Sequence, residues 1–415
     1  MTERDIPVYC GTEALLKLVR YCRSRELHRF LLVADENTYL ALGQRAEAAL
    51  DGLGWSVQTV ILRGPEVLPD EPRIRTVLSH AHDQELMCLA VGSGTITDIT
   101  RYASYCARSS FISLPTAPSV DAYTTGGAAV VLGGVKRTLP THPPTAVFAD
   151  LQTLCQAPRD MIAAGFGDVI GKFTSLADWN LGALLLEESF DLAIANRLRS
   201  ALRTCVHRAE DIRRALPTGI RTLMRALIES GMCMLEYGTS RPASGSEHLL
   251  SHFWEMMQHR RGENTALHGA KVGVGTVLTA ERYAAIRSLR REDVARRLRT
   301  ARLPSRQDEA HAIQAAFGSA ADSVSEHYLP FLEPITANWA QIQQKIVDQW
   351  ACVSEIAAQV PPADHIARLL EQAGAPSAPA EIGLAEPEVR QALQLSRYLR
   401  GRFTVDTLGR LLGLW

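Results

Sequence analysis

Short apolar runs alternate with amphipathic stretches over the first 115 residues. Four runs stand out: Arg29–Asp35, Ser56–Leu62, Leu86–Gly92 and the F-I-S-L-P segment that starts at Phe111. They are apolar almost throughout, and helical segments separate them. Strands of this kind are typical of a parallel sheet that helices cover on both faces. The pattern therefore predicts an α/β domain in the N-terminal part of the chain.

The pattern changes between Gly126 and Pro140, where the apolar runs become shorter. The runs A-A-V-V-L and V-K-R-T-L lie on either side of Gly133 and Gly134. Two short runs that are joined by a pair of glycines favour a β-hairpin.

The rest of the chain has a helical pattern. Apolar residues recur near the 3.6-residue period from Ile220 to Leu235, and Glu281–Arg299, Glu309–Tyr328 and Pro387–Trp415 have a similar character. The Pro/Ala-rich segment Pro376–Glu381 is predicted to be a loop. A chain of 415 residues exceeds what one hydrophobic core usually supports. We therefore predict an α/β domain over residues 1–155 and a helical domain over residues 156–415.

Composition narrows the class of protein. The 44 basic and 45 acidic residues leave no excess of positive charge for nucleic acid or for an anionic membrane. The eight cysteines form no C-x-x-C motif, which is typical of a reducing compartment. The chain opens on M-T-E-R-D, and no apolar run approaches eighteen residues. These features predict a cytoplasmic protein that inserts in no membrane.

Two segments of the first domain suit a dinucleotide. The G-S-G-T-I-T-D turn, Gly92–Asp98, follows an apolar run and precedes a predicted helix, so that its glycines and free N–H groups can approach a pyrophosphate. It lacks the third glycine of G-x-G-x-x-G, and many strand-to-helix turns contain two glycines. Asp35 ends an earlier strand, where its carboxylate can accept hydrogen bonds from a ribose. An N-cap by Asp35 or Asn37 explains the same pattern.

A third segment, Pro115–Thr125, is a polar turn after a strand, P-T-A-P-S-V-D-A-Y-T-T. Its hydroxyl groups can line a ligand, or they can satisfy the backbone of the loop.

Three histidines and an aspartate have the spacing of a metal site. His248 and His252 are four residues apart, which places them on one face of a helix, and His268 follows after a connection long enough for the chain to turn back. Asp168, in A-G-F-G-D-V-I, can complete an N/N/O ligand set that leaves positions open for catalysis. The simpler alternatives are a chance pair of histidines and an acid that favours a helix N-terminus.

On these motifs the chain resembles a known family. The most specific segments are F-I-S-L-P-T-A-P-S-V-D-A, A-G-F-G-D-V-I-G-K with the following T-S-L-A-D-W, S-R-P-A-S-G-S-E-H-L-L-S-H, and L-H-G-A-K-V-G-V-G-T. They are similar to the metal-dependent polyol dehydrogenases, or iron-containing alcohol dehydrogenases, a superfamily that also contains dehydroquinate synthase. The resemblance runs from about Phe30 to the C-terminus and is strongest to its bacterial glycerol-1-phosphate-forming branch.

The resemblance implies a Rossmann-like N-terminal domain and a helical C-terminal domain, with the active site in the cleft between them. It also implies reversible reduction of dihydroxyacetone phosphate to sn-glycerol 1-phosphate by NAD(P)H, a divalent metal ion (zinc, nickel or iron), and usually a homodimer. A different polyol dehydrogenase, and a cyclase of the dehydroquinate synthase type that uses NAD transiently, remain alternatives. A non-catalytic nucleotide-binding regulator is a more remote one, because the Asp/His/His set is intact.

Site residues are carried over position by position. The implied metal ligands are Asp168, His248 and His268. The resemblance implies that Asp168 also contacts the substrate. The implied catalytic and substrate-binding residues are Asp121, His252 and Arg241, the last of which contacts phosphate in the dehydroquinate synthase branch. The implied cofactor positions are Asp35, Gly94, Thr95, Ile96, Thr97, Asp98, Thr116, Ser119 and Thr125. Lys136 and Lys172 are weaker phosphate candidates.

Two details leave further alternatives open. Arg241 can instead pair with a neighbouring acid such as Glu247. The H-R-R-G-E-N segment after His252 is longer than in archaeal relatives, which leaves the local loop geometry open.

Overall fold

The computed structural model describes residues 6–64, 66–81, 85–132, 135–263, 266–303 and 305–415. The chain forms two compact units. The first comprises residues 1–169 and 203–238, and the second comprises residues 170–202 and 239–415. The chain thus crosses between the units three times. The prediction, with one boundary at residue 155, had a single crossing. The difference arises because the helices of residues 159–170 and 217–237 pack with the first unit.

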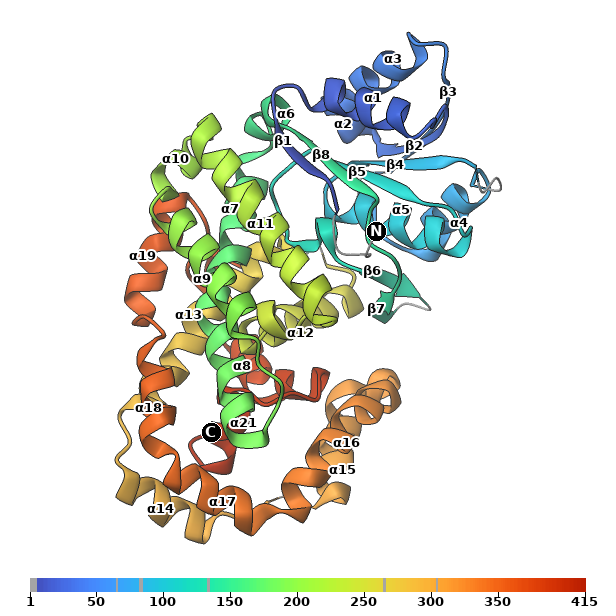
Figure 1. The fold of residues 1–415 in the computed structure, drawn as a ribbon. Helices are drawn as coiled ribbons and strands as arrows, with labels where there is room; N and C mark the ends of the chain where they lie inside the picture. Colours follow the sequence, from blue (N-terminus) through green and yellow to red (C-terminus); the bar gives the residue numbers. More distant parts are fainter. Residues whose placement is uncertain (1–5, 65, 82–84, 133–134, 264–265, 304) are drawn as a thin grey trace. The chain divides into compact units, whose positions relative to one another are not determined.

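The first unit contains a six-stranded parallel sheet, whose strands lie in the order β1-β8-β5-β4-β2-β3 (Figure 1). Its strands are β1 (Val8–Gly11), β2 (Arg29–Asp35), β3 (Ser56–Leu62), β4 (Met87–Gly92), β5 (Phe111–Pro115) and β8 (Ala146–Asp150). The four predicted strands are β2 to β5, and the parallel sheet is confirmed. The sequence analysis missed β1 and β8.

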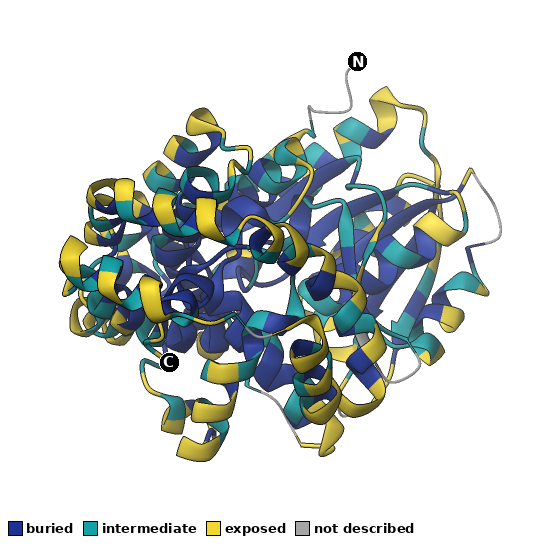
Figure 2. Ribbon diagram, turned by 90° about the horizontal axis from the view of Figure 1, so that it is seen from below, coloured by how far each residue is buried: buried dark blue, intermediate teal, exposed yellow. Residues whose placement is uncertain are grey.

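Helices cover both faces of this sheet. Alternate residues of one strand separate into two cores: Phe30 and Leu32 of β2 pack with α1 and α3, whereas Leu31 and Val33 pack with α4 and α5. The helices of this unit are α1 (Ala14–Ser24), α2 (Glu36–Thr38), the π-turn η1 (Tyr39–Gly43), α3 (Gln44–Asp51), α4 (Glu71–Leu78), α5 (Gly94–Cys106), η2 (Ala122–Thr124), α6 (Leu151–Cys155), α7 (Arg159–Ile170), α10 (Ala209–Arg213) and α11 (Pro217–Tyr237). β4, β5 and β8 are buried along their whole length, and Figure 2 shows such strands in dark blue.

The predicted hairpin is present as two antiparallel strands, β6 (Gly127–Leu132) and β7 (Val135–Pro140). Its turn residues, Gly133 and Gly134, lie outside the described residues.

The second unit is helical, as predicted. It contains α8 (Lys172–Leu186), η3 (Arg241–Ala243), α12 (Ser246–Arg260), α13 (His268–Arg287), α14 (Arg291–Thr300), α15 (Arg306–Phe317), η4 (Gly318–Ala320), α16 (Ala321–Ala337), α17 (Trp339–Asp348), α18 (Trp350–Ala358), α19 (Ala363–Ala373), η5 (Pro379–Ile382), α20 (Glu386–Leu395), η6 (Ser396–Leu399) and α21 (Val405–Leu411). The helix α9 (Leu192–Val206) runs from this unit into the first. None of the helices in the described ranges is long and apolar enough to cross a bilayer.

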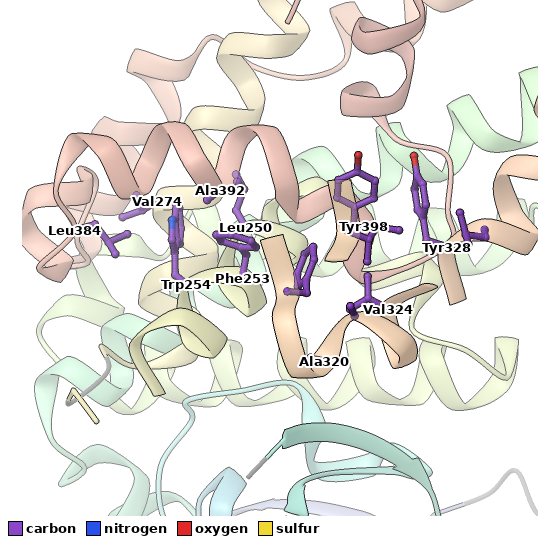
Figure 3. Packing of buried hydrophobic residues seen from close by; sticks show 14 of the residues in the cluster. Leu250, Phe253, Trp254, Val274, Ala320, Val324, Tyr328, Leu384, Ala392 and Tyr398 are labelled. Atoms are coloured by element: carbon purple, nitrogen blue, oxygen red, sulfur yellow. The ribbon is translucent and has the colours of Figure 1, made fainter. Parts of the chain in front are cut away.

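An apolar cluster joins α12 to the helices that follow it. Leu250, Phe253 and Trp254 pack there with Tyr328 and Tyr398 from the later helices (Figure 3). Because these residues lie on the face of α12 that is buried in the cluster, its other face is free to present polar side chains.

Three predicted helical stretches are interrupted. The stretch Glu281–Arg299 breaks between α13 and α14, where the Leu289 carbonyl accepts a hydrogen bond from Trp350. The stretch Glu309–Tyr328 breaks at Gly318, which has a positive φ of 52°. The tail breaks at residues 400–404, which are non-helical and precede α21.

Candidate active site

The carboxyl ends of β2, β4 and β5 lie at one edge of the first unit's sheet, because the strands are parallel and adjacent. The chain leaves β2 toward β3 on one side and leaves β4 toward β5 on the other. α3, after β2, packs on one face, and α5, after β4, packs on the opposite face. Open α/β sheets bind ligands at such a topological switch point. The predicted cofactor residues after β2, β4 and β5 therefore share the expected edge.

The turn from β4 into α5 is built as predicted. β4 ends at Gly92 and α5 begins at Gly94. A Cβ atom added at Gly92 would lie 2.4 Å from the Cβ of Ile96, so this turn requires a glycine. Ser93, at the N-cap, makes no side-chain hydrogen bond to the helix. The first N–H groups of α5 are therefore not capped by that side chain, which suits an anion.

Asp98 is committed to an internal ion pair. Its carboxylate lies 2.8 Å from the guanidinium of Arg101, and both side chains are buried. Arg101 in turn donates hydrogen bonds to the carbonyls of Ala122 and Gly127. Asp98 thus helps to hold the loop before the hairpin, whatever its relation to a cofactor.

Asp35 caps a helix, which is the alternative that the sequence left open. Its Oδ1 accepts a hydrogen bond from the Thr38 N–H at 2.8 Å, and the Thr38 hydroxyl accepts one from the Asp35 N–H at 3.0 Å. Asp35 remains partly exposed at the end of β2. The cap occupies Oδ1, so a ribose contact through Oδ2 is compatible with it.

The polar turn after β5 is largely buried. Thr116 and Ser119 are 6% and 4% exposed, and the Thr116 N–H donates to the Gly92 carbonyl. The Thr125 hydroxyl donates to the carbonyls of Ala122 and Gly127. The hydroxyl of Thr125 therefore satisfies loop backbone, while Thr116 is tied to the turn that precedes α5.

The first unit brings Asp121 and Asp168 together. The Asp121 N–H donates to Oδ2 of Asp168 at 3.1 Å, and the Ser230 hydroxyl donates to Asp121 at 2.7 Å. Close packing of α7 against the turn at Pro118 fixes this arrangement. A Cβ atom at Gly165 of α7 would lie 1.8 Å from the Pro118 carbonyl oxygen, so only glycine lets α7 meet the turn.

The second unit brings the three histidines together. His248 and His252 lie on α12, and His268 is the first residue of α13. Their ring centroids are 5.3 to 6.2 Å apart. A Cβ atom at Gly275 of α13 would lie 2.7 Å from the Glu247 carbonyl oxygen. Glycine at this position therefore allows α13 to pack closely on α12.

Two carboxylates that the sequence analysis did not assign to the site orient the imidazoles. His248 Nδ1 lies 2.8 Å from Glu247, and His268 Nδ1 lies 3.0 Å from Glu255. Metal-binding histidines are commonly held in this way, which leaves Nε2 for the ion. The donor set of His248 and His268 therefore fits a divalent metal. The available sequence signals were Glu247 directly before His248 and Glu255 three residues after His252.

Glu255 also offers a second arrangement. Ligand atoms of His252, Glu255 and His268 all lie within 4.8 Å of one another. Lys271 lies 3.2 Å from the same carboxylate, which competes with a metal for it. Burial lowers the pKa of His252 to about 3, against the opposing effect of Glu255. His252 is therefore a neutral imidazole at pH 7.

A buried acid beneath α12 fixes the start of that helix. Asp178 accepts hydrogen bonds from the Ser246 N–H at 2.7 Å, the Val405 N–H at 2.7 Å and the Tyr283 hydroxyl at 2.6 Å. Burial, and then the nearby Glu247, raise the pKa of Asp178 to about 7. Burial also opposes ionisation of Glu247, but hydrogen bonds led by that of His248 bring its pKa below the ordinary value.

Arg241 is almost fully buried and pairs with Glu188, not with Glu247. Its Nε lies 2.8 Å from Glu188, and its Nη2 donates to the carbonyls of Asp178 and Phe403 at 2.9 and 2.7 Å.

The structure describes the side chain of one of the two lysines named from the sequence. Lys172 is buried at the start of α8. The side chain of Lys136 lies outside the described residues.

Comparison with known proteins places the chain in a family. Residues 9–158 match the family model described as iron-containing alcohol dehydrogenase. A glycerol-1-phosphate dehydrogenase [NAD(P)+] of Geobacillus stearothermophilus is 37% identical over 409 residues, 97% of this chain and 92% of that protein. The enzyme of that name from Halalkalibacterium halodurans is 46% identical over 276 residues, 66% of this chain and 69% of that protein.

A solved structure supports the fold. The crystal structure of a probable glycerol dehydrogenase from Sinorhizobium meliloti 1021 aligns with a TM-score of 0.63 over 99% of this chain and 98% of that one, at 15% identity. The likeness in sequence covers both units, and it confirms the resemblance found in the motifs. The chain belongs to the glycerol-1-phosphate dehydrogenase family, and its residues 9–158 match the iron-containing alcohol dehydrogenase model.

Proposed function

We propose that the chain catalyses the reversible, NAD(P)H-dependent reduction of dihydroxyacetone phosphate to sn-glycerol 1-phosphate. The observation that carries the proposal is the pair of imidazoles, His248 and His268, each oriented by its own carboxylate. The chain that contains them is 37% identical, over nearly its whole length, to an enzyme named for this reaction.

For the metal we propose the ligands Asp168, His248 and His268. Asp168 lies in the first unit and the two imidazoles lie in the second. A bound divalent ion supplies a Lewis acid for the carbonyl of the substrate. An N/N/O set of this kind accepts zinc, nickel or iron, and availability often decides between them.

The residues of the chain have separate parts in the reaction. Gly94–Ile96 offer N–H groups at the start of α5 for the cofactor pyrophosphate, and the nicotinamide supplies the hydride. Asp121 is positioned by Ser230 to accept a hydrogen bond from a substrate hydroxyl. Burial lowers the pKa of His252, which favours the neutral imidazole. It orders the water, or the substrate hydroxyl, that brings the proton to the new alcohol.

A spectrophotometric screen tests this proposal. Dihydroxyacetone phosphate, both glycerol phosphate enantiomers, glycerol and dihydroxyacetone are each combined with NAD(H) and NADP(H). We expect stoichiometric NAD(P)H oxidation with dihydroxyacetone phosphate, and the reverse reaction with the 1-phosphate enantiomer alone. A cyclase of the dehydroquinate synthase type shows no net change in NADH. Preference for glycerol, or for the 3-phosphate enantiomer, contradicts the proposed substrate.

The resemblance also supports a cytoplasmic homodimer. The eight cysteines are thiols in the structure, and thiols suit a reducing compartment. Light scattering during size-exclusion chromatography measures the oligomeric state directly.

A further inference from the structure

Two arginines of the second unit converge on one serine. They lie in the segment between η6 and α21. Arg400 Nη1 donates a hydrogen bond to the Ser240 hydroxyl at 2.7 Å, and Arg402 Nη2 lies 3.3 Å from the same oxygen. Arg402 Nη1 also donates to the Ser244 carbonyl. The two guanidinium groups are thus held side by side by neutral acceptors.

Neither arginine has an ion-pair partner within 4.0 Å in the part of the chain that the structure describes. Both are partly exposed. Burial lowers the pKa of Arg400, and burial together with the charges of Arg400 and Arg241 lowers that of Arg402. Two like charges that share a confined place are unfavourable unless an anion joins them. This pair therefore has the charge and the donors of an anion site, but no anion of its own.

The nearby carboxylates are already occupied. Glu247 accepts hydrogen bonds from Gly245 and Thr174, both at 2.6 Å, and contacts His248. Glu188 pairs with Arg241. Both carboxylates thus have their own partners, and neither forms an ion pair within 4.0 Å with Arg400 or Arg402 in the described ranges.

The backbone fixes both arginines in place. A Cβ atom at Gly401, between them, would lie 2.5 Å from the His327 carbonyl oxygen, so the segment packs tightly on α16. On the other side, Arg241 donates to the Phe403 carbonyl at 2.7 Å. A segment held in this way costs little further ordering when a ligand binds.

The pair borders the histidine cluster. The turn η6 (Ser396–Leu399), directly before Arg400, packs against α12, the helix that carries His248 and His252. Arg402 donates to the Ser244 carbonyl, two residues before α12 begins. A ligand that reaches from the arginine pair to the histidine cluster has its anionic end at the arginines and its neutral end at the imidazoles.

We propose that Arg400 and Arg402 bind the phosphate group of the substrate, and that Arg241 positions them. This inference rests on the proposed function. Guanidinium groups form charge-assisted, often bidentate hydrogen bonds with phosphate oxygens, and a dianion balances two cations. Recognition of the phosphate is thereby assigned to residues 400 and 402, which lie 15 and 13 residues before Trp415.

The test uses Arg400→Met and Arg402→Met, with a lysine variant at each position. Arg390→Met is the matched control, because Arg390 is an exposed arginine of α20 that pairs with Glu386. The first measurement is the thermal midpoint in sodium phosphate against sodium chloride at equal ionic strength. We expect phosphate to raise the thermal midpoint of wild type and of the control above the value in chloride. In both methionine variants we expect the midpoints in phosphate and in chloride to be equal.

The second measurement is kcat/KM for dihydroxyacetone phosphate and for dihydroxyacetone. We expect each methionine variant to lose about 100-fold with the phosphorylated substrate and little with the neutral one, with partial recovery in the lysine variants. If a methionine variant is active and its ratio of kcat/KM for the two substrates equals that of wild type, the inference is overturned and the proposed function stays intact. The inference is also overturned if the variants change only the ratio of kcat/KM for NADPH to kcat/KM for NADH.

The two proposals fail separately. If wild type does not reduce dihydroxyacetone phosphate, but phosphate stabilises it through both arginines, the proposed function fails and the anion site stands. If phosphate stabilises the methionine variants as much as wild type, the anion site fails.

Discussion

The cofactor edge of the first unit and the histidine cluster of the second unit are built by different means. At the edge, glycines and backbone groups set the geometry: Gly92 admits Ile96, and Gly165 admits the turn at Pro118. In the cluster, buried side chains set it: Glu247 and Glu255 orient the imidazoles, and Asp178 holds the start of α12.

The difference predicts how each region fails. A site that is made by backbone packing tolerates loss of a polar side chain but not an added methyl group. A site that is made by buried charges depends on every partner, because removal of one leaves another unpaired. The predictions below test this contrast, starting with the largest expected effect.

We expect His268→Ala to lose the bound metal and to lower kcat by about 1000-fold or more, because a catalytic Lewis acid contributes several kcal/mol to the transition state. Elemental analysis of the purified variant, together with turnover of dihydroxyacetone phosphate, checks both parts. Full metal occupancy in this variant would remove His268 from the ligand set.

Two further variants separate the possible metal ligands. Glu255→Gln is expected to keep the metal with an affinity about 10- to 100-fold weaker, if Glu255 only orients His268. His248→Ala is expected to lose the metal. The opposite result, with Glu255 essential and His248 dispensable, would support the alternative set of His252, Glu255 and His268.

The next effect is on the first unit. We expect Gly165→Ala to destabilise the protein by about 3 kcal/mol, because its Cβ would meet the Pro118 carbonyl oxygen at 1.8 Å and α7 must shift. Gly126→Ala is the control, since its Cβ would make only an ordinary contact with Leu235 at 3.4 Å. Urea unfolding of both variants measures the difference. Equal stability of the two would show that the turn is not held by this close packing.

Much of the first unit could be predicted from the sequence, because local pattern determines it. The runs Arg29–Asp35 and Ser56–Leu62 coincide with β2 and β3, and the turn at Gly92 lies between a strand and a helix. The short strand Val8–Gly11 was missed, since its few residues carry no periodic signal and it pairs with Ala146–Asp150 far along the chain.

The second unit was less predictable, because its site depends on contacts between distant residues. The i,i+4 spacing indicated His248 and His252. No local pattern indicated that Asp178 would accept a hydrogen bond from Val405, 227 residues away. Arg241 was named from the resemblance, but its partner Glu188 is 53 residues distant and follows no helical spacing.

An effect of similar size concerns pH. Folding raises the pKa of Asp178 from 3.8 to about 7, so the folded state holds a proton more tightly than the unfolded state. The associated stability is complete below pH 3.8 and is lost as pH rises toward 7. The free energy of unfolding of wild type, relative to Asp178→Asn, is therefore expected to fall over this range by about 3 kcal/mol.

Urea unfolding at several pH values checks this slope. Both proteins are stripped of metal with a chelator, because metal binding itself depends on pH. Asp348→Asn is the exposed control and is expected to keep the slope of wild type. A wild-type slope in Asp178→Asn would show that this carboxyl does not titrate in the range.

The smallest expected effect is at Asp35, a charged position of the cofactor edge. Its carboxylate would repel the 2′-phosphate of NADPH, so wild type is expected to prefer NADH. Asp35→Asn keeps an oxygen for the Thr38 N–H and removes the charge, whereas Asp35→Ala removes both. We expect kcat/KM for NADPH, relative to NADH, to rise about tenfold in both variants, and only Asp35→Ala to lose about 1 kcal/mol of stability with the cap. If wild type prefers NADPH tenfold, or if the ratio is the same in all three proteins, Asp35 is a helix cap alone. The cofactor edge would then discriminate through backbone groups and hydroxyls, without a charge.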